Sequence, residues 1–194
     1  MEIKQVYEHY PRPSQPEGEF KFCPLCGAAL LAAHSGQAVQ PTCTRCGFVQ
    51  YRNPAPTVSL LLVEAERVLL GKRRGSPGKG TWALPSGYVD YDEDFLTTAI
   101  REAREETGLE VNIESIINVV SSFVSAKYHF LGVYVTARVE GGELKAGDDL
   151  ETAEWFPLGG PLPELGFAED AHAIALYRSG FRGLPVQAAR AYIP

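Results

Sequence analysis

The chain lacks any apolar segment long enough to cross a lipid bilayer. Its longest strongly apolar run, residues 58–63, already contains Ser59, whereas a membrane-spanning helix needs about 20 apolar residues. The N-terminal residues also lack the apolar stretch of a secretory signal peptide. We therefore expect a soluble, cytoplasmic protein without a membrane partner.

Basic residues are scarce as well. Lys and Arg number 18 against 24 Asp and Glu, which gives a formal net charge of −6. General affinity for nucleic acid depends on a basic surface, so no nucleic-acid partner is expected. A small phosphorylated substrate is still compatible with this charge, because bound cations can supply the missing positive charge.

Several catalytic signatures are missing too. The sequence has no P-loop, no dinucleotide-binding glycine fingerprint and no G-x-S-x-G motif, so ATP-driven work, hydride transfer and acyl transfer have no support. The length of 194 residues suits one medium domain with a small appendage. We predict a tail at 1–19, a small cysteine-containing domain at 20–52 and a main domain at 53–194. Two prolines at 53–56 make that segment the expected linker.

All four cysteines lie in the small domain, in two C-x2-C-G motifs. This paired spacing is typical of a structural zinc site, in which four thiolates leave no open position for catalysis. Iron is the other metal that fits, whereas two disulfides would be unexpected in a reducing cytoplasm. We predict one Zn²⁺ that is needed to fold this domain, because about 30 residues cannot build a sufficient hydrophobic core. The predicted ligands are Cys23, Cys26, Cys43 and Cys46.

Acidic residues gather at an unfavourable place in the main domain. Glu102, Glu105 and Glu106 are spaced to share one helix face. They precede Gly108, a natural helix end, where the helix dipole disfavours anions. A divalent cation that prefers oxygen ligands would offset this repulsion. The alternative is a solvated acidic face beside two arginines.

The surrounding residues fit the pattern G-x5-E-x7-R-E-U-x-E-E-x-G-U, where U is bulky or apolar. A chance match at one position has a probability below about 10⁻⁷ for average residue frequencies. The pattern begins at Gly87, and Ala103 and Leu109 occupy the two U positions. It resembles the Nudix box. The resemblance implies an α/β/α sandwich and a hydrolase that uses Mg²⁺ or Mn²⁺ to cleave a diphosphate.

The resemblance also implies roles for individual residues of the box. Glu102 and Glu106 would be the main ligands of the catalytic cations, and the backbone carbonyl of Ser86 would join them. Glu105 would be a further ligand or the general base. Glu93 and Arg101 would form a structural ion pair.

One expected carboxylate lies outside the box. In the ribbon-containing Nudix proteins a metal-binding glutamate lies six residues before an aromatic residue, and Asp149 holds that place relative to Trp155. We predict Asp149 as a ligand or general base, and Glu151 would take this role if Asp149 does not. The alternative without a catalytic role is an exposed acidic turn. The basic loop before the box offers Arg73 and Lys79 for substrate phosphates.

The domain layout resembles two groups of Nudix enzymes. NADH pyrophosphatases carry an SQPW-type motif after the box, but residues 120–125 lack its proline and tryptophan. The layout is closer to plant ADP-ribose/FAD pyrophosphatases, although Val124 stands where many ADP-ribose hydrolases have proline. We predict cleavage of FAD or ADP-ribose, with Tyr88 as a further substrate contact. NADH hydrolysis and a non-catalytic nucleotide-binding regulatory module are the alternatives. Similar proteins often form homodimers.

Periodicity and turn residues predict the main secondary-structure elements. The expected helices span residues 93–107, with Asp92 as N-cap, and residues 168–178. A turn is expected at Gly141 and Gly142. The expected strands span residues 57–63, 67–72, 113–124, 128–139 and 152–156.

Overall fold

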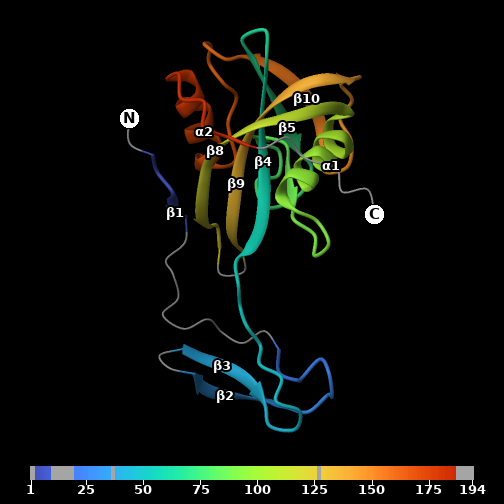
Figure 1. Cartoon of the computed structure of the whole chain (residues 1–194), viewed down its shortest axis with the longest axis vertical. Coiled ribbons are helices and arrows are strands. Elements are labelled where there is room, and N and C mark those ends of the chain that lie inside the picture. The colour runs from blue at the N-terminus through green and yellow to red at the C-terminus, as the bar shows by residue number, and fades with distance from the viewer. Residues whose placement is uncertain (1–2, 10–19, 36–37, 126–127, 187–194) are drawn as a thin grey trace.

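A computed structural model describes residues 3–9, 20–35, 38–125 and 128–186. A large α/β part and a small β-hairpin part are joined by an extended segment (Figure 1). Residues 10–19 of the expected tail lie outside the described residues. No helix within the described ranges is long and apolar enough to cross a membrane.

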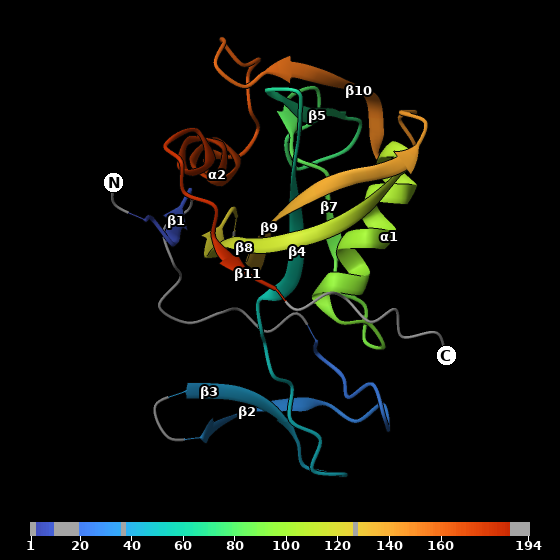
Figure 2. The same cartoon turned by 45° about the horizontal axis from the view of Figure 1, so that its top comes forward.

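The main sheet has the strand order β1-β8-β9-β4-β5-β10. Its long strands curve together across the centre of the molecule (Figure 2). β4 pairs with β9 in parallel, whereas β8 pairs with β9, and β5 with both β4 and β10, in antiparallel fashion. The strands on this path are β1 (Val6–Glu8), β4 (Ala55–Glu64), β5 (Arg67–Arg73), β8 (Leu109–Phe123), β9 (His129–Gly142) and β10 (Leu150–Pro157).

Three short strands lie off this path and pair with its inner strands. β6 (Trp82–Ala83) pairs with β5, β7 (Ser86–Tyr88) pairs with β4, and β11 (Leu184–Pro185) pairs with β8. The segment that connects β6 to β7 therefore runs from a strand paired with β5 to a strand paired with β4. It carries the residues immediately before the Nudix box.

The sheet is covered by one helix on each face, which confirms the predicted α/β/α sandwich. Successive residues of β4 point to opposite faces. Leu60 and Leu62 pack in the cluster that includes Ala99 of α1 (Phe95–Thr107). Leu61 packs in the cluster that includes Ile174 of α2 (Ala168–Arg178). The leucine-rich run of the sequence is thus buried from both sides.

α1 begins later than predicted. Its N-cap is Asp94, whose side chain accepts hydrogen bonds from the backbone N–H groups of Leu96 and Thr97. The predicted N-cap, Asp92, was wrong because the chain still turns there. The helix ends as predicted at Gly108, which has a φ of 71°. A side chain at that position would meet the Glu143 carbonyl oxygen at 2.6 Å.

The expected turn at Gly141 and Gly142 was wrong, and the expected linker at 53–56 is shorter than predicted, because strand pairing includes the residues concerned. Gly141 and Gly142 pair with Glu110 and Leu109 at the end of the long β8–β9 hairpin. β4 starts at Ala55, inside the expected linker. Within it the carbonyl of Pro56 accepts a hydrogen bond from Val89 N–H at 3.1 Å, a contact that needs no N–H from the proline.

Part of the expected N-terminal tail belongs to the sheet. β1 pairs in parallel with β8, and Tyr7 is only 2% exposed. Ser121 N–H donates to the Gln5 carbonyl at 2.8 Å. This three-residue strand was not predicted, because it precedes a proline-rich stretch and its stability comes from β8, more than 100 residues away in the sequence.

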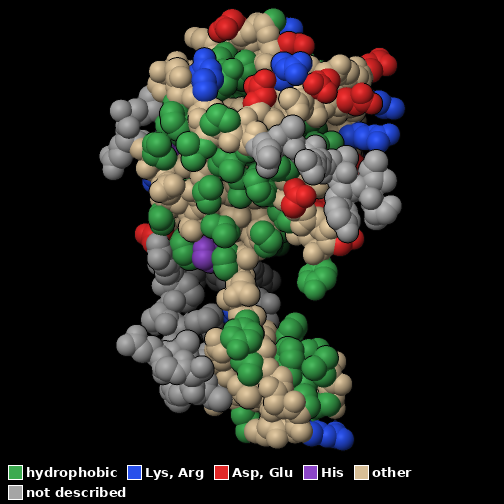
Figure 3. All heavy atoms as spheres, viewed as in Figure 1, with side chains coloured by type: hydrophobic (Ala, Val, Ile, Leu, Met, Phe, Trp, Pro, Cys, Tyr) green, Lys and Arg blue, Asp and Glu red, His purple; other side chains and the backbone are tan. Residues whose placement is uncertain are grey.

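The small domain is built around the hairpin of β2 (Leu30–Ser35) and β3 (Ala38–Cys43). Hydrophobic side chains gather on its surface (Figure 3). Phe22, Leu25 and Tyr51 are between 65% and 74% exposed. The domain thus buries few of its large apolar side chains, as expected for a unit folded around a metal.

Candidate active site and cysteine cluster

A cavity of about 400 Å³ is lined by residues of both helices and of the main sheet. Its walls come from β4, β5 and the loop after it, β7, β8, β9, α1, α2 and the loop before β10. The lining includes Arg73, Ser86, Gly87, Tyr88, Glu102, Glu106, Ser122, Tyr128, Phe130, Tyr134, Asp148, Asp149, Phe167, Glu169 and Asp170.

The first glycine of the box makes room for a carboxylate. A Cβ atom on Gly87 would lie 1.7 Å from Glu102 Oε1, which is far inside contact distance. The carboxylate therefore reaches the cavity only where the neighbouring strand has no side chain. This is a steric reason for glycine at the start of the motif.

Glu106 is the most deeply buried carboxylate of the box. It is 2% exposed, and its Oε2 accepts a hydrogen bond from Ser86 N–H at 2.8 Å. Burial raises the pKa of Glu106 to about 8. Burial also raises the pKa of Glu102, which is 7% exposed. A divalent cation between these oxygens would stabilise their ionised forms, so the donor set fits Mg²⁺ or Mn²⁺.

Arg101 organises the remaining charges of α1. Its guanidinium donates to Glu93 through two hydrogen bonds of 2.8 Å each, which confirms the predicted pair. It also donates to Glu102 at 2.7 Å and to Glu105 at 3.0 Å. The hydrogen bonds from Arg101 lower the pKa of Glu93 to about 2. Glu105 has a half-exposed side chain and is not among the residues that line the cavity.

The loop before β10 folds against the end of α1. Gly147 N–H donates to the Glu106 carbonyl at 3.0 Å, and a Cβ atom on Gly147 would lie 2.3 Å from the Glu105 carbonyl oxygen. This contact brings Asp148 and Asp149 to the cavity that contains the box carboxylates. Glu151 lies two residues further on, in β10, and instead forms a surface ion pair with Lys72 at 3.7 Å. Of the two alternatives, the structure brings only Asp149 to the cavity.

The three predicted substrate contacts are placed differently. Arg73 lines the cavity, donates to the Pro77 carbonyl at 2.8 Å and lies 5.4 Å from the Phe167 ring. Tyr88 lies at the rim, is 51% exposed and meets Phe130 edge-on at 5.9 Å. Lys79 is exposed and does not belong to the lining, so its role stays a prediction.

The opposite wall contains two buried carboxylates that the sequence did not reveal. Asp170 is 3% exposed and accepts hydrogen bonds from Leu84 N–H and from the Tyr134 hydroxyl, both at 2.9 Å. Burial raises the pKa of Asp170 to about 7. Glu169 accepts from the Ser122 hydroxyl and lies 3.2 Å from His9 Nε2. Acidic residues in the first turn of a helix are common, so their pattern carried no functional signal.

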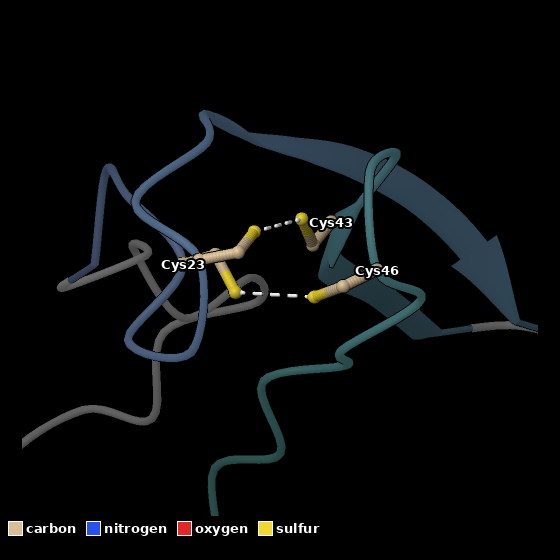
Figure 4. A group of neighbouring side chains, drawn as sticks. Cys23, Cys43 and Cys46 are labelled. Atoms are coloured by element: carbon tan, nitrogen blue, oxygen red, sulfur yellow. Dashed lines mark hydrogen bonds between the residues drawn. The ribbon is translucent and has the colours of Figure 1, made fainter.

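The four cysteines converge in the small domain (Figure 4). Their sulfur atoms all lie within 4.8 Å of one another, and none of them is in a disulfide. The Cys23–Cys46 and Cys26–Cys43 sulfur pairs are each 3.5 Å apart. Four thiolates at the Zn–S distance of about 2.3 Å would lie about 3.8 Å apart, whereas a disulfide needs about 2.05 Å. The arrangement fits a tetrahedral metal.

Both cysteine loops have the same backbone geometry. The N–H groups of Gly27 and Gly47 donate to the carbonyls of Cys23 and Cys43, each at 2.9 Å. The two glycines have φ values of 71° and 76°, which favour glycine as predicted. Each loop therefore turns its two sulfurs toward the same point.

Residues 53–177 match the NUDIX domain family, so the chain belongs to the Nudix family and is a Nudix hydrolase acting as a pyrophosphatase. It is 40% identical over 118 residues to an ADP-ribose pyrophosphatase of Methanocaldococcus jannaschii, an alignment that covers 60% of this chain and 69% of the relative.

Two further comparisons extend over more of the chain. It is 33% identical over 169 residues to the NAD-capped RNA hydrolase NudC of Pseudomonas aeruginosa, covering 82% of this chain and 57% of that protein. The chain thus spans little more than half of the NudC relative. A Nudix hydrolase crystal structure from Nitrosomonas europaea superposes with a TM-score of 0.72 at 21% identity, covering 85% and 96% of the two chains, and supports the fold.

Proposed function

We propose that this protein cleaves the diphosphate of a nucleoside diphosphate linked to another moiety, with ADP-ribose or FAD as substrate, and releases a nucleoside monophosphate. The observation that carries this proposal is the cavity itself. It unites Glu102 and Glu106 of the box with Asp149 from a separate loop, beside the cationic Arg73. Carboxylates from two segments around one cavity suit divalent cations that hold a diphosphate.

The residues that would hold Mg²⁺ or Mn²⁺ are Glu102, Glu106 and the carbonyl of Ser86, with Asp148 and Asp149 facing them across the cavity. When bound, the cations supply a water molecule of lowered pKa. Glu106 is already oriented by Ser86 N–H. Because burial raises the pKa of Glu106, a nearby cation would stabilise the ionised form of this side chain.

Asp149 is the stronger candidate for the residue that accepts the proton from the attacking water or binds a further cation. Its loop is fixed to α1 through Gly147. Glu105, the other candidate base, is held by Arg101 at the cavity's edge. A base must reach the attacking water within about 2.6–3.2 Å or through one further water, which favours the residue that faces the cavity.

The rim of the cavity suits an aromatic ring. Phe130 lies 6.0 Å from Tyr128 in a stacked arrangement and meets Tyr88 edge-on. Such rings bind planar bases at little conformational cost. Arg73 lines the same cavity, and its guanidinium is suited to phosphate oxygens.

The choice of substrate rests on the relatives' names together with the cavity. The Methanocaldococcus jannaschii relative is an ADP-ribose pyrophosphatase, which favours ADP-ribose. A second candidate is an NAD-type dinucleotide, free as NADH or at the end of an RNA, because similarity to NudC extends over more of the chain. Residues 120–125 still lack the proline and tryptophan of the NADH-specific motif.

The cysteine cluster would hold one structural Zn²⁺. Its four sulfurs leave no position for substrate, so its contribution is the fold of the small domain. The domain boundaries predicted from the sequence remain part of this proposal.

Product analysis tests the proposal. The purified chain should convert ADP-ribose and FAD to a nucleoside monophosphate in the presence of Mg²⁺ or Mn²⁺, and a chelated control should not. A kcat/KM for NADH at least about tenfold above both would select the second candidate. Nucleotide binding without turnover of any of these compounds would instead support the regulatory module.

A further inference from the structure

Asp170 connects α2 to the segment that leads into the Nudix box. It lies in the first turn of the helix, but its carboxylate is turned away from the helix itself. Each carboxylate oxygen accepts a hydrogen bond from another element: Oδ2 from Leu84 N–H and Oδ1 from the Tyr134 hydroxyl. Both donors lie outside α2, so helix capping does not explain this carboxylate.

The segment held by Asp170, residues 84–86, runs from the end of β6 to the first residue of β7. Leu84 is 2% exposed, so its backbone N–H needs a partner inside the protein. The next residue, Pro85, accepts a hydrogen bond from Leu60 N–H at 2.8 Å through its carbonyl. Ser86 N–H then donates to Glu106 at 2.8 Å. Three consecutive residues are thus fixed to α2, to β4 and to the box helix.

The order of these contacts gives Asp170 a specific effect. Leu84 N–H is two residues from the backbone of Ser86, whose N–H orients Glu106 and whose carbonyl is the proposed ligand. Without an acceptor at position 170 for Leu84 N–H, the segment would lose its hydrogen bond to α2. Its carbonyl and N–H groups could then turn, because a buried donor seeks another partner. Packing of the Leu84 side chain alone would not fix the orientation of these groups.

We infer that Asp170 is a positioning residue, which fixes residues 84–86 so that Ser86 presents its N–H to Glu106 and its carbonyl oxygen to the catalytic cation. The inference rests on the proposed function for the role of that carbonyl. The hydrogen bonds from Leu84 to Asp170 and from Ser86 to Glu106 stand without it. The role requires an acceptor at position 170, not a negative charge.

Two substitutions separate an acceptor from a charge. Asp170→Asn keeps one oxygen for Leu84 N–H and can donate from its amide to the Tyr134 hydroxyl oxygen. Asp170→Leu has a similar size but no acceptor. We expect kcat for ADP-ribose to stay within about threefold in Asp170→Asn and to fall by about 30-fold or more in Asp170→Leu, since a displacement of about 1 Å can cost 10²-fold. The Mg²⁺ concentration for half-maximal rate should rise only in Asp170→Leu.

Ile174→Ala is the matched control. Ile174 is buried in the same helix, so this variant loses packing while Asp170 keeps its contacts. It should change stability but not the Mg²⁺ dependence. Equal losses in Asp170→Asn and Asp170→Leu would overturn the inference, because they would show that the charge matters. Unchanged kinetics and unchanged Mg²⁺ dependence in Asp170→Leu would also overturn it.

Hydrogen exchange of the full chain provides a test that needs no turnover. The amide of Leu84 should exchange slowly in the parent protein and in Asp170→Asn, and at least about tenfold faster in Asp170→Leu or in any folded fraction of it. Fast exchange in the parent protein would refute the positioning role. Absence of hydrolysis by the parent protein would refute the proposed function alone, because the exchange comparison would still decide the role of Asp170.

Discussion

The protein contains two sets of side chains that we propose as metal ligands, and they are assembled in different ways. In the small domain, four sulfurs from two equivalent loops already lie within 4.8 Å of one another. In the Nudix domain, carboxylates from α1 and from the loop before β10 surround a much larger cavity, and Arg101 donates to three of the box carboxylates. The first set is closed and suits a structural role, whereas the second is open and suits a bound substrate.

The comparison also separates local from tertiary information. Each cysteine loop is a few residues long, and its glycine adopts the positive φ that the turn needs. The carboxylate cavity exists only when β7, α1 and the loop at 147–149 come together. We therefore expect loss of metal to unfold the first site, but to change charge and rate at the second.

The largest effect should follow from removal of the zinc. Chelation, or the double variant Cys26→Ser and Cys46→Ser, should cost the small domain about 10 kcal/mol or more of metal-linked folding free energy. Hydrogen exchange should become fast in residues 20–52 and stay slow in the core of β4 and β9, since the Nudix domain has its own core. Elemental analysis should give one zinc per chain before treatment. A zinc-free chain whose small domain stays protected would contradict this account.

Loss of the buried box carboxylate should have the next largest effect. Glu106→Gln should lower kcat by about 10³-fold, because a bound cation contributes several kcal/mol to the transition state. The variant should remain folded, and its thermal midpoint without Mg²⁺ should not fall, because Gln removes the cost of burying a carboxyl group that is ionised in the unfolded chain. Steady-state kinetics and calorimetry measure both effects. A fully active Glu106→Gln would show that the cation binds elsewhere.

The loop carboxylate provides a smaller and more specific comparison. Asp149→Asn should lower kcat by about 10²-fold with the fold intact. The matched control is Glu151→Gln, which removes an exposed pair with Lys72 and should change kcat by less than about twofold. The reverse result would assign the ligand to Glu151.

Much of the first site and about half of the second could be predicted from the sequence. The cysteine spacing and the box are local patterns, and Asp149 was placed by its distance from Trp155 along one chain segment. Asp170 could not be found, because its partner Leu84 is 86 residues away and the pairing depends on how α2 covers the sheet. β1 was missed for the same reason. Asp92 was predicted as the N-cap in place of Asp94 because neighbouring acidic residues suit that position equally well.

The pH dependence should differ between the metal-bound and metal-free protein. Burial raises the pKa of Glu106 to about 8 and that of Asp170 to about 7. In the unfolded chain these groups ionise near 4–4.5, so the folded state binds more protons between those values. Without Mg²⁺, stability should therefore fall as pH rises from about 5 to 8. We expect the thermal midpoint to drop by about 10 °C or more.

Added Mg²⁺ should reverse this loss, and more strongly at pH 8 than at pH 6, because cation binding needs ionised carboxylates. Calorimetry with and without Mg²⁺ at the two pH values measures it. Glu106→Gln serves as the control and should show a smaller dependence on both pH and Mg²⁺. A stabilisation by Mg²⁺ that is equal at both pH values would contradict the assignment of Glu106 as a ligand.

The smallest effect concerns the N-terminus of the box helix. Asp94→Ala removes the acceptor for Leu96 N–H and Thr97 N–H. It should cost about 1 kcal/mol of unfolding free energy, measured by denaturant titration, while kcat changes by less than about twofold. Asp92→Ala is the matched control and should be neutral. Equal destabilisation by both variants would show that the helix begins earlier.

Anomalous diffraction from crystals with Mn²⁺ and a non-hydrolysable ADP-ribose analogue tests the central claim most directly. The claim is that the open carboxylate cavity holds the catalytic cations. The account predicts manganese peaks about 2.1 Å from carboxylate oxygens of Glu102 and Glu106 and from the Ser86 carbonyl oxygen, with Asp149 bound directly or through water. Manganese only at other positions, with the analogue's diphosphate outside the cavity, would contradict it.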